Sequence, residues 1–349
     1  MAIKKKGCSI RDLAKYVGVS PGTVSRVLNN KPSNVKITEA TRKKVMDAAR
    51  ELNYSPNINA RRLFTNRSQV IGLLVPAHKK DDNSHTLGDN NLIKTMSGIE
   101  MVVVERGYRL LLLFQNEAFM TRREYMDIFN EKSVDGLLIW GASDQDNYVH
   151  ELREADYPSV LINSHPTDVD QLNFIGNDNV GGSRSAVEHL IEKGHQRIAC
   201  ITGTRGHSIA EQRLQGYKDA LQAHGLPIDE SLIMNGDYLI AGGYRCMQEL
   251  IEHHAGQFTA VAAANDNSAL GAMRAIHDAG LTIPNDIAIT GGDGMQSPQL
   301  FDPPITTFQV DNLNVGRRGT ELLLDLIDGK QKEPVYEILP TQLLVRQST

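Results

Sequence analysis

Near its start the chain reads Ser9-Ile-Arg-Asp-Leu-Ala-Lys-Tyr-Val-Gly-Val-Ser-Pro-Gly-Thr-Val-Ser-Arg-Val-Leu-Asn29. This run contains two short segments with apolar residues at helical spacing, separated by Gly18. Ser9 and Asp12 have the spacing of a capping box for the first segment. Ser20 and Pro21 are an N-cap and a first helical residue for the second. The run therefore predicts a helix-turn-helix.

The second segment is expected to turn Val24, Val27 and Leu28 inward. Its outward side chains are then Thr23, Ser25, Arg26 and Asn29. An ordinary helical hairpin has the same pattern, but the charge favours a nucleic-acid partner. Residues 1–68 hold 15 basic and 4 acidic residues, a net charge of +11. The remainder holds the other 22 basic and 38 acidic residues, a net charge of −16, so only the head is suited to a polyanion.

The composition limits the class of protein. A chain of 349 residues with 40% hydrophobic and 23% charged residues fits two or three globular domains. No apolar run approaches the roughly 20 residues that span a membrane, and no apolar segment of a secretory signal follows Lys4–Lys6. A cytoplasmic, nucleoid-associated location is therefore expected. Cys8, Cys200 and Cys246 lack metal-ligand spacing, so we expect free thiols, no metal and no cofactor.

Two further segments complete the basic head. Thr38 is expected to cap a third helix, and Pro56 disfavours helix just before it, which gives a headpiece of residues 1–56. Residues 57–68 contain Arg61-Arg62 and are too few to form a stable helix alone. They are either a plain linker or a short hinge helix that folds when two copies meet on DNA.

From Gln69 to Thr349 the pattern changes to short apolar strands alternating with helices. Such alternation predicts parallel sheets covered on both faces. The count of strands suits two Rossmann-like sheets of five or six strands each, with a ligand cleft between them. One helix is expected over 121–131. The polar segment 77–91 is predicted to be a loop near the mouth of the cleft.

Several motifs in the chain are shared with one known family. In the head they are Asp12-Leu-Ala, Val19-Ser, Thr23–Asn29, Leu52–Asn57 and Ala60–Leu63. In the body they are Gly194-His195, Arg213–Tyr217, Ala264–Asp266 and Pro303–Thr307. Through these residues the chain resembles, over nearly its whole length, the lactose/galactose repressor (LacI/GalR) family of bacterial transcription regulators.

The resemblance implies an all-α helix-turn-helix headpiece, a hinge at 57–68 and an α/β core at 69–349 of the periplasmic-binding-protein type. Three crossings between subdomains are expected near 163, 308 and 334. The N-subdomain would then comprise about 69–163 and 308–333, and the C-subdomain about 164–307 and 334–349. The family's tetramerising helix has no counterpart here. A homodimer on a palindromic operator is therefore expected.

The resemblance also implies the DNA contacts. The second helix would lie in the major groove, beginning with Ser20, Pro21 and Gly22. Because Pro21 and Gly22 offer no side-chain hydrogen bond, base reading would shift to Thr23, Ser25, Arg26 and Asn29. Arg26 is the expected bidentate donor to guanine, with a phosphate contact as the alternative. Leu63, with Ala60 beside it, would enter the minor groove from the hinge.

The effector contacts come from the same resemblance. Arg213, Asp293, Asn265 and Asp266 occupy positions that hold effectors in the family, and charged groups of this kind grip sugar hydroxyls. Tyr238 and Trp140 are candidate platforms for the apolar face of the ligand. Structural ion pairs of Arg213 and Asp266, and a core role for Trp140, are the alternatives. Gly292 and Gly294 replace larger family residues, which suggests an enlarged cleft.

The basic head and the family resemblance together imply a DNA-binding transcription regulator, a repressor, controlled by a sugar or glycoside effector. A purine or nucleoside effector remains an alternative. A sugar-handling enzyme is much less favoured, because the chain has no dinucleotide fingerprint, phosphate loop, nucleophile elbow or His-Glu-x-x-His motif.

Overall fold

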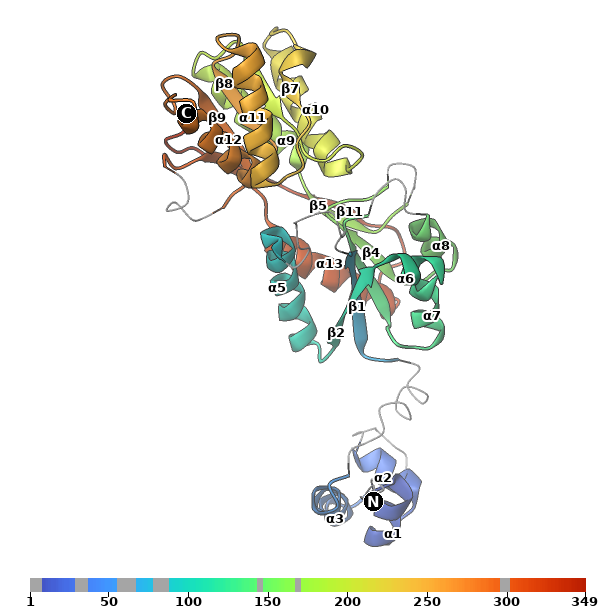
Figure 1. The fold of residues 1–349 in the computed structure, drawn as a ribbon. Coiled ribbons are helices and arrows are strands. Elements are labelled where there is room, and N and C mark those ends of the chain that lie inside the picture. Colours follow the sequence, from blue (N-terminus) through green and yellow to red (C-terminus); the bar gives the residue numbers. More distant parts are fainter. Residues whose placement is uncertain are drawn as a thin grey trace. The chain divides into compact units, whose positions relative to one another are not determined.

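The structure is a computed structural model that describes residues 8–28, 37–54, 67–77, 88–142, 147–166, 171–295 and 302–349. The chain divides into two compact units, Met1–Ser68 and Gln69–Thr349 (Figure 1). We describe each unit by itself. Within the described residues, no helix has the length and apolar character needed to cross a bilayer.

The first unit contains helices α1 (Ile10–Val17), α2 (Pro21–Leu28) and α3 (Glu39–Glu51). The predicted capping box of α1 is confirmed, since the Asp12 N–H donates to Ser9 Oγ and the Ser9 N–H donates to Asp12 Oδ2 at 2.9 Å. Gly18 ends α1 with φ +76°, a left-handed conformation that glycine adopts without strain. The sequence therefore sets both ends of the first helix.

A small apolar core joins these three helices. Leu13, Val24 and Val45 are fully buried, one from each helix, and Val27 is nearly so. Because Val24 and Val27 point into this core, the opposite side of α2 is left for solvent or a partner. The inward positions predicted for the second helix are confirmed, with Leu28 partly buried against the same core.

In the second unit, the first sheet has six parallel strands in the order β11-β5-β4-β3-β1-β2. Their bounds are β1 (Val70–Pro76), β2 (Arg109–Gln115), β3 (Gly136–Trp140), β4 (Ser159–Ile162), β5 (Phe174–Asn177) and β11 (Tyr336–Leu339). The helices α5 (Asn90–Glu105) and α13 (Asn312–Ile327) cover one face. The other face is covered by α6 (Glu117–Thr121), α7 (Glu124–Asn130) and α8 (Tyr148–Glu154).

The helix expected over 121–131 is present as α7, but it begins at Glu124, because the chain turns between α6 and α7. Arg123 has φ +56°, which interrupts the helix. This turn lets the Arg123 guanidinium and the Tyr125 hydroxyl both donate to Glu151 of α8, at 2.7 Å each. The side-chain pattern of the segment is helical throughout, so the break depends on a partner distant in sequence.

The second sheet has the order β12-β10-β9-β8-β6-β7, with β12 antiparallel to β10 and the other pairs parallel. Its strands are β6 (Ile198–Ile201), β7 (Ile233–Met234), β8 (Ala260–Ala263), β9 (Ala288–Asp293), β10 (Thr306–Gln309) and β12 (Gln342–Leu344). Helices α9 (Asn179–Glu192) and α10 (Ser208–Ala223) cover one face. Helices α11 (Ile240–His254) and α12 (Asp266–Asp278) cover the other, and a short η2 (Glu230–Leu232) precedes β7.

The chain crosses between the two subdomains three times, and two of the expected positions need correction. Strand β5 pairs with β4 and β11 in the first sheet, so the first crossing follows Asn177 rather than lying near 163. Strand β11 also belongs to the first sheet, so the third crossing follows Leu339 rather than lying near 334. Strands of four residues carry no pattern that identifies their sheet, which explains both errors.

Glycine allows close contact between paired helices. A Cβ at Gly98 of α5 would lie 1.9 Å from the Leu313 carbonyl oxygen of α13. In return, a Cβ at Gly316 of α13 would lie 2.0 Å from the Thr95 carbonyl oxygen of α5. The two backbones therefore touch, and α5 and α13 lie side by side in Figure 1.

Candidate functional site

A cavity of about 510 Å³ lies between the two subdomains of the core. Residues at the carboxyl ends of the strands line it, as expected for sheets of this type. Pro76, Trp140, Asn163 and Asn177 come from the first sheet and Asp293 comes from the second. Arg213 of α10 and Asn91 of α5 also line it.

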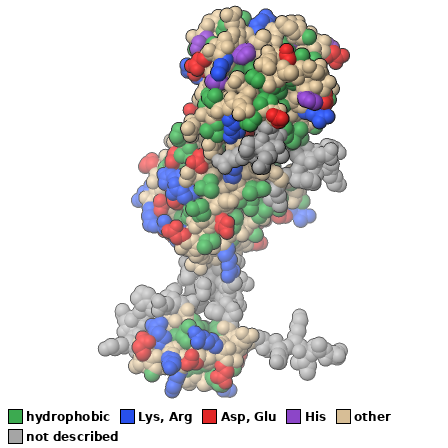
Figure 2. All heavy atoms as spheres, turned by 90° about the vertical axis from the view of Figure 1, so that its left-hand side faces the viewer, with side chains coloured by type: hydrophobic (Ala, Val, Ile, Leu, Met, Phe, Trp, Pro, Cys, Tyr) green, Lys and Arg blue, Asp and Glu red, His purple; other side chains and the backbone are tan. Residues whose placement is uncertain are grey.

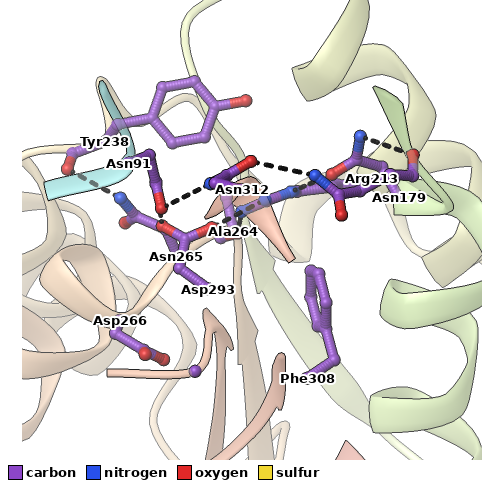
Figure 3. Close-up of polar contacts among 12 residues, drawn as sticks. Asn91, Asn179, Arg213, Tyr238, Ala264, Asn265, Asp266, Asp293, Phe308 and Asn312 are labelled. Carbon is purple, nitrogen blue, oxygen red and sulfur yellow. Dashed lines mark hydrogen bonds and ion pairs between the residues drawn. The ribbon is translucent and has the colours of Figure 1, made fainter. Parts of the chain in front are cut away.

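Arg213 makes three side-chain hydrogen bonds in the cavity and is only 7% exposed. Its Nη2 lies 2.7 Å from Asp293 Oδ1, its Nε donates to Asn179 Oδ1 at 3.0 Å, and its Nη1 donates to the Ala264 carbonyl (Figure 3). The guanidinium also lies 4.9 Å from the centre of the Phe308 ring. Burial alone would lower the pKa of Arg213, but Asp293 offsets burial and the pKa is raised.

Asp293 connects the two subdomains across the cavity. It ends β9 with φ +99°, an unusual conformation for a residue with a side chain. One carboxylate oxygen accepts from Arg213 of its own subdomain, and the other accepts from Asn91 Nδ2 of the first subdomain at 3.0 Å. Arg213 and Asp293 are thus brought together in the cavity, as an ion pair that a hydroxylated ligand can join.

Tyr238 and Trp140 both line the cavity. The Tyr238 hydroxyl, the Trp140 Nε1 and the Ser164 hydroxyl are buried atoms with no hydrogen-bond partner among the described residues. A Cβ at Gly203 would collide with the Tyr238 ring, so Gly203 makes room for it. Burial raises the pKa of Tyr238, which keeps its hydroxyl protonated. These atoms are able to hydrogen-bond a ligand.

The neighbours Asn265 and Asp266 have different positions. Asn265 lines the cavity, caps α12 through the Ser268 N–H, and donates to the Tyr238 carbonyl at 3.1 Å. Asp266 is fully buried and lies outside the cavity lining, which corrects the expectation that it contacts a ligand. Its Oδ2 accepts the Met295 N–H at 2.6 Å. Burial first, and then the charge of Asp293, raises the pKa of Asp266 to about 7.

The enlarged cleft expected from Gly292 and Gly294 is also corrected. A Cβ at Gly292 would lie 2.6 Å from the Phe308 ring, so that ring occupies the space that a larger residue would fill. A Cβ at Gly294, where φ is +69°, would meet Gln309. Neither glycine opens the cavity. The Phe308 ring instead supports Arg213 from below (Figure 3).

The sequence interpretation missed an amide cluster on the first-subdomain side. Its members are Asn91, Asn163, Asn177 and Asn312, and all four line the cavity. The charged residues Asp89, Lys94 and Asp237 and the imidazole of His207 line it too. The signal that could have found the amides is their position, because Asn163 and Asn177 directly follow or end buried strands.

In the helical unit, the predicted DNA-contact residues of α2 differ in exposure. Ser20, Pro21, Gly22 and Arg26 are exposed, whereas Thr23 and Ser25 are half-buried. Ser20 Oγ accepts the Thr23 N–H at 3.1 Å and lies 2.9 Å from Thr23 Oγ1, so the N-cap is confirmed. Asn29, Ala60, Leu63 and the hinge helix lie outside the described residues, as does most of segment 77–91.

Sequence comparison now identifies the family. Residues 9–57 match bacterial regulatory proteins of the lacI family, and residues 187–349 match a periplasmic binding protein-like domain. The HTH-type transcriptional regulator CelR of Thermobifida fusca is 33% identical over 347 residues, which are 99% of each chain. The chain belongs to the LacI family. A second relative, the HTH-type transcriptional repressor PurR of Vibrio atlanticus (strain LGP32), is 34% identical over 98% of each chain.

Solved structures of the LacI family agree with the fold. The lac repressor dimer bound to operator and the anti-inducer ONPF has a TM-score of 0.85 at 28% identity, covering 98% of this chain and 99% of that one. The CelR–cellobiose complex has a TM-score of 0.74 at 32% identity with the same coverage. The chain is thus a DNA-binding transcription regulator with an effector domain, and its relatives are regulators rather than enzymes.

Proposed function

We propose that this LacI-family regulator is a repressor that binds a palindromic operator as a homodimer and responds to a neutral sugar such as cellobiose, which the related CelR binds. The observation that carries the proposal is the Arg213–Asp293 pair inside a cavity that also presents Tyr238 and Trp140. Charged groups that grip hydroxyls and aromatic rings that cover C–H faces are the two requirements of a sugar site.

The charges of the cavity favour a neutral ligand. Arg213 is already matched by Asp293, and the other charged lining residues are Asp89, Asp237 and Lys94, two carboxylates against one ammonium group. The pKa of Asp89 is raised, first by burial and also by the charge of Asp293. A sugar acid would add a further negative charge beside these groups, whereas sugar hydroxyls donate hydrogen bonds to them. A purine base offers fewer donors, although the relative PurR supports it as the alternative.

The DNA-reading part of the proposal rests on α2. Arg26 is its exposed basic side chain, and it projects from a helix whose opposite face is anchored by Val24 and Val27. An arginine on a helix in the major groove donates two hydrogen bonds to guanine. Thr23 and Ser25 are half-buried, so we expect them to contribute less to base recognition than Arg26.

The homodimer is supported by an apolar surface on the first subdomain. On the outer side of α5, Ile93, Met101 and Val104 are exposed, Val104 by 71%. Strand β2 is an edge strand and exposes Leu111 and Phe114. Figure 2 faces the side on which α5 lies in Figure 1 and shows hydrophobic side chains on that surface. Exposed apolar groups of this kind mark protein interfaces, and the related lac repressor is a dimer on its operator.

The test is a thermal-shift screen of the full chain, because a ligand that binds the native state raises its melting temperature. Cellobiose is expected to raise Tm and to quench or shift the fluorescence of Trp140, the single tryptophan. Glucose, galacturonate and hypoxanthine are the comparison ligands, and each is expected to have a smaller effect. A larger shift with hypoxanthine would replace the sugar by the purine alternative, and a larger shift with galacturonate would contradict the charge argument.

A further inference from the structure

The three crossing segments between the subdomains are tied to one another by hydrogen bonds. The Asp311 N–H of the second crossing donates to Asn177 Oδ1 at the first, at 2.8 Å. The Asp178 N–H of the first crossing donates to the Leu339 carbonyl at the third, at 2.9 Å. Asn177 and its neighbour Asp178 therefore link the first crossing to the other two, at the place where the angle between the subdomains is set.

Three buried amides gather at the same place. Asn163, Asn177 and Asn312 are 6%, 4% and 3% exposed. Asn312 Oδ1 accepts from both Asn163 Nδ2 and Asn177 Nδ2 at 2.9 Å. Asn177 Nδ2 also donates to Asn163 Oδ1 at 3.1 Å. Because buried amides are costly to leave unpaired, each of these side chains constrains the orientation of the others.

Asn91 joins this amide group to the cavity. Its Oδ1 accepts from Asn312 Nδ2 at 2.9 Å, and its Nδ2 donates to Asp293 Oδ2 at 3.0 Å (Figure 3). A continuous series of hydrogen bonds therefore runs from Arg213 and Asp293 in one subdomain, through Asn91, to Asn312 at the second crossing.

We propose that Asn91 is a positioning residue that couples ligand binding at Asp293 to the conformation of the crossing segments. A ligand hydroxyl that donates to Asp293 Oδ2 competes with the Asn91 amide for the same oxygen. When Asn91 turns away, its Oδ1 leaves Asn312 Nδ2, a buried donor that must then find a new acceptor. Asn312 is shared by Asn163 and Asn177, so its rearrangement reaches the crossing segments directly.

This inference rests on the proposed function, since it concerns the response to a ligand at Asp293. It depends on charge as well as on geometry. Asp89 caps α5, and its Oδ1 accepts the Asn91 N–H at 2.7 Å. The backbone of Asn91 is therefore held in place, and its side chain is the part that exchanges hydrogen-bond partners. The amide also separates two carboxylates, Asp89 and Asp293, which interact electrostatically.

The test uses the full chain and a DNA duplex that the parent protein selects from a random pool. In Asn91→Ala, the operator Kd is expected to change at least about fivefold without any ligand, in the direction that saturating cellobiose produces in the parent. Cellobiose should then change it little further. Hydrogen exchange at the Asp311 amide is expected to accelerate, because its acceptor Asn177 loses a fixed orientation. Asn91→Asp, which places a carboxylate against Asp293, should have a larger effect on both readouts.

Asn285→Ala is the matched control, since Asn285 is an exposed asparagine that lies outside the cavity lining. Its operator affinity and Asp311 exchange are expected to equal those of the parent. Parent values for both readouts in Asn91→Ala and Asn91→Asp would overturn the inference. If cellobiose fails to bind the parent, the proposed sugar is wrong, but the ligand-free operator affinity and the exchange rate still decide the role of Asn91.

Discussion

The two walls of the cavity are built from different chemistry. The wall of the second subdomain holds an ion pair, Arg213 and Asp293, at 2.7 Å. The wall of the first subdomain also has charged members, Asp89 and Lys94, but it is distinguished by neutral amides, Asn163 and Asn312 among them, that hydrogen-bond to one another at 2.9 Å. Charged partners in a buried site are costly to separate, whereas an amide can exchange one hydrogen bond for another.

The two walls also differ in whether a lost hydrogen-bond partner is replaced by another. The Arg213 guanidinium pairs with the Asp293 carboxylate. Removal of Arg213 leaves this buried carboxylate without a counter-charge in the described part of the wall. In the amide wall, Asn312 Oδ1 accepts from two donors, so the loss of one leaves the other. The charged wall is therefore suited to holding a ligand, and the amide wall is suited to changing with it.

The largest effect is expected on replacing Arg213 by methionine. The variant leaves Asp293 buried and unpaired, so the free energy of unfolding should fall by about 3–5 kcal/mol. Cellobiose affinity should fall at least about 100-fold by calorimetry. Arg213→Lys restores the charge without the planar fork and should recover part of the stability but little of the affinity.

Arg205→Met is the control for this change, because Arg205 is exposed and donates to Asn235 outside the ion pair. It should keep both the stability and the affinity of the parent. Cellobiose binding of parent strength in Arg213→Met would show that the charged wall does not hold the ligand.

A second effect of similar size concerns pH and Asp266, beneath the charged wall. The fold raises the pKa of Asp266 from 3.8 to about 7. A raised carboxyl pKa means that the folded state favours the protonated form. Its contribution to stability is therefore complete below about pH 4 and is lost as pH rises through about 7, a change of about 4 kcal/mol. Asp266→Asn should remove this part of the pH dependence in denaturant unfolding measured from pH 4 to 8.

An unchanged pH profile in Asp266→Asn would mean that Asp266 is ionised throughout this range.

The smallest effect is expected in the amide wall. Asn163 has φ +65°, so Asn163→Gly keeps the backbone conformation and removes only the amide. Because Asn312 Oδ1 still accepts from Asn177, the free energy of unfolding should fall by only about 1 kcal/mol. Denaturant titration measures it. A loss as large as that of Arg213→Met would contradict the redundancy of this wall.

Sequence alone was sufficient for the headpiece and for the class of the core. The caps Ser9, Ser20 and Thr38 and the turn at Gly18 are local signals, and each forms as predicted. The two covered parallel sheets follow from the alternation of apolar strands and helices. Helix caps and turns depend on residues close in the chain, so they can be predicted without the tertiary fold.

The cavity was predicted only in part, because its members are set by tertiary contacts. Arg213 and Asp293 were found, but Asp266 turns toward Met295 instead of the cavity. The amides were missed because an isolated asparagine has no pattern, and their pairing joins Asn91 to Asn312, 221 positions apart. The space at Gly292 was misjudged for the same reason, since Phe308 fills it from another strand.

The glycine contacts between α5 and α13 have a mechanical consequence. Gly98 and Gly316 bring the two backbones into direct contact, which leaves no flexible side chains between them to absorb movement. This close contact would favour movement of α5 and α13 as one rigid unit. One end of this unit lies at the amides Asn91 and Asn312, and its length carries the exposed apolar side chains of α5. A small rotation of α5 and α13 at the cavity would then move the surface where a second protomer is expected.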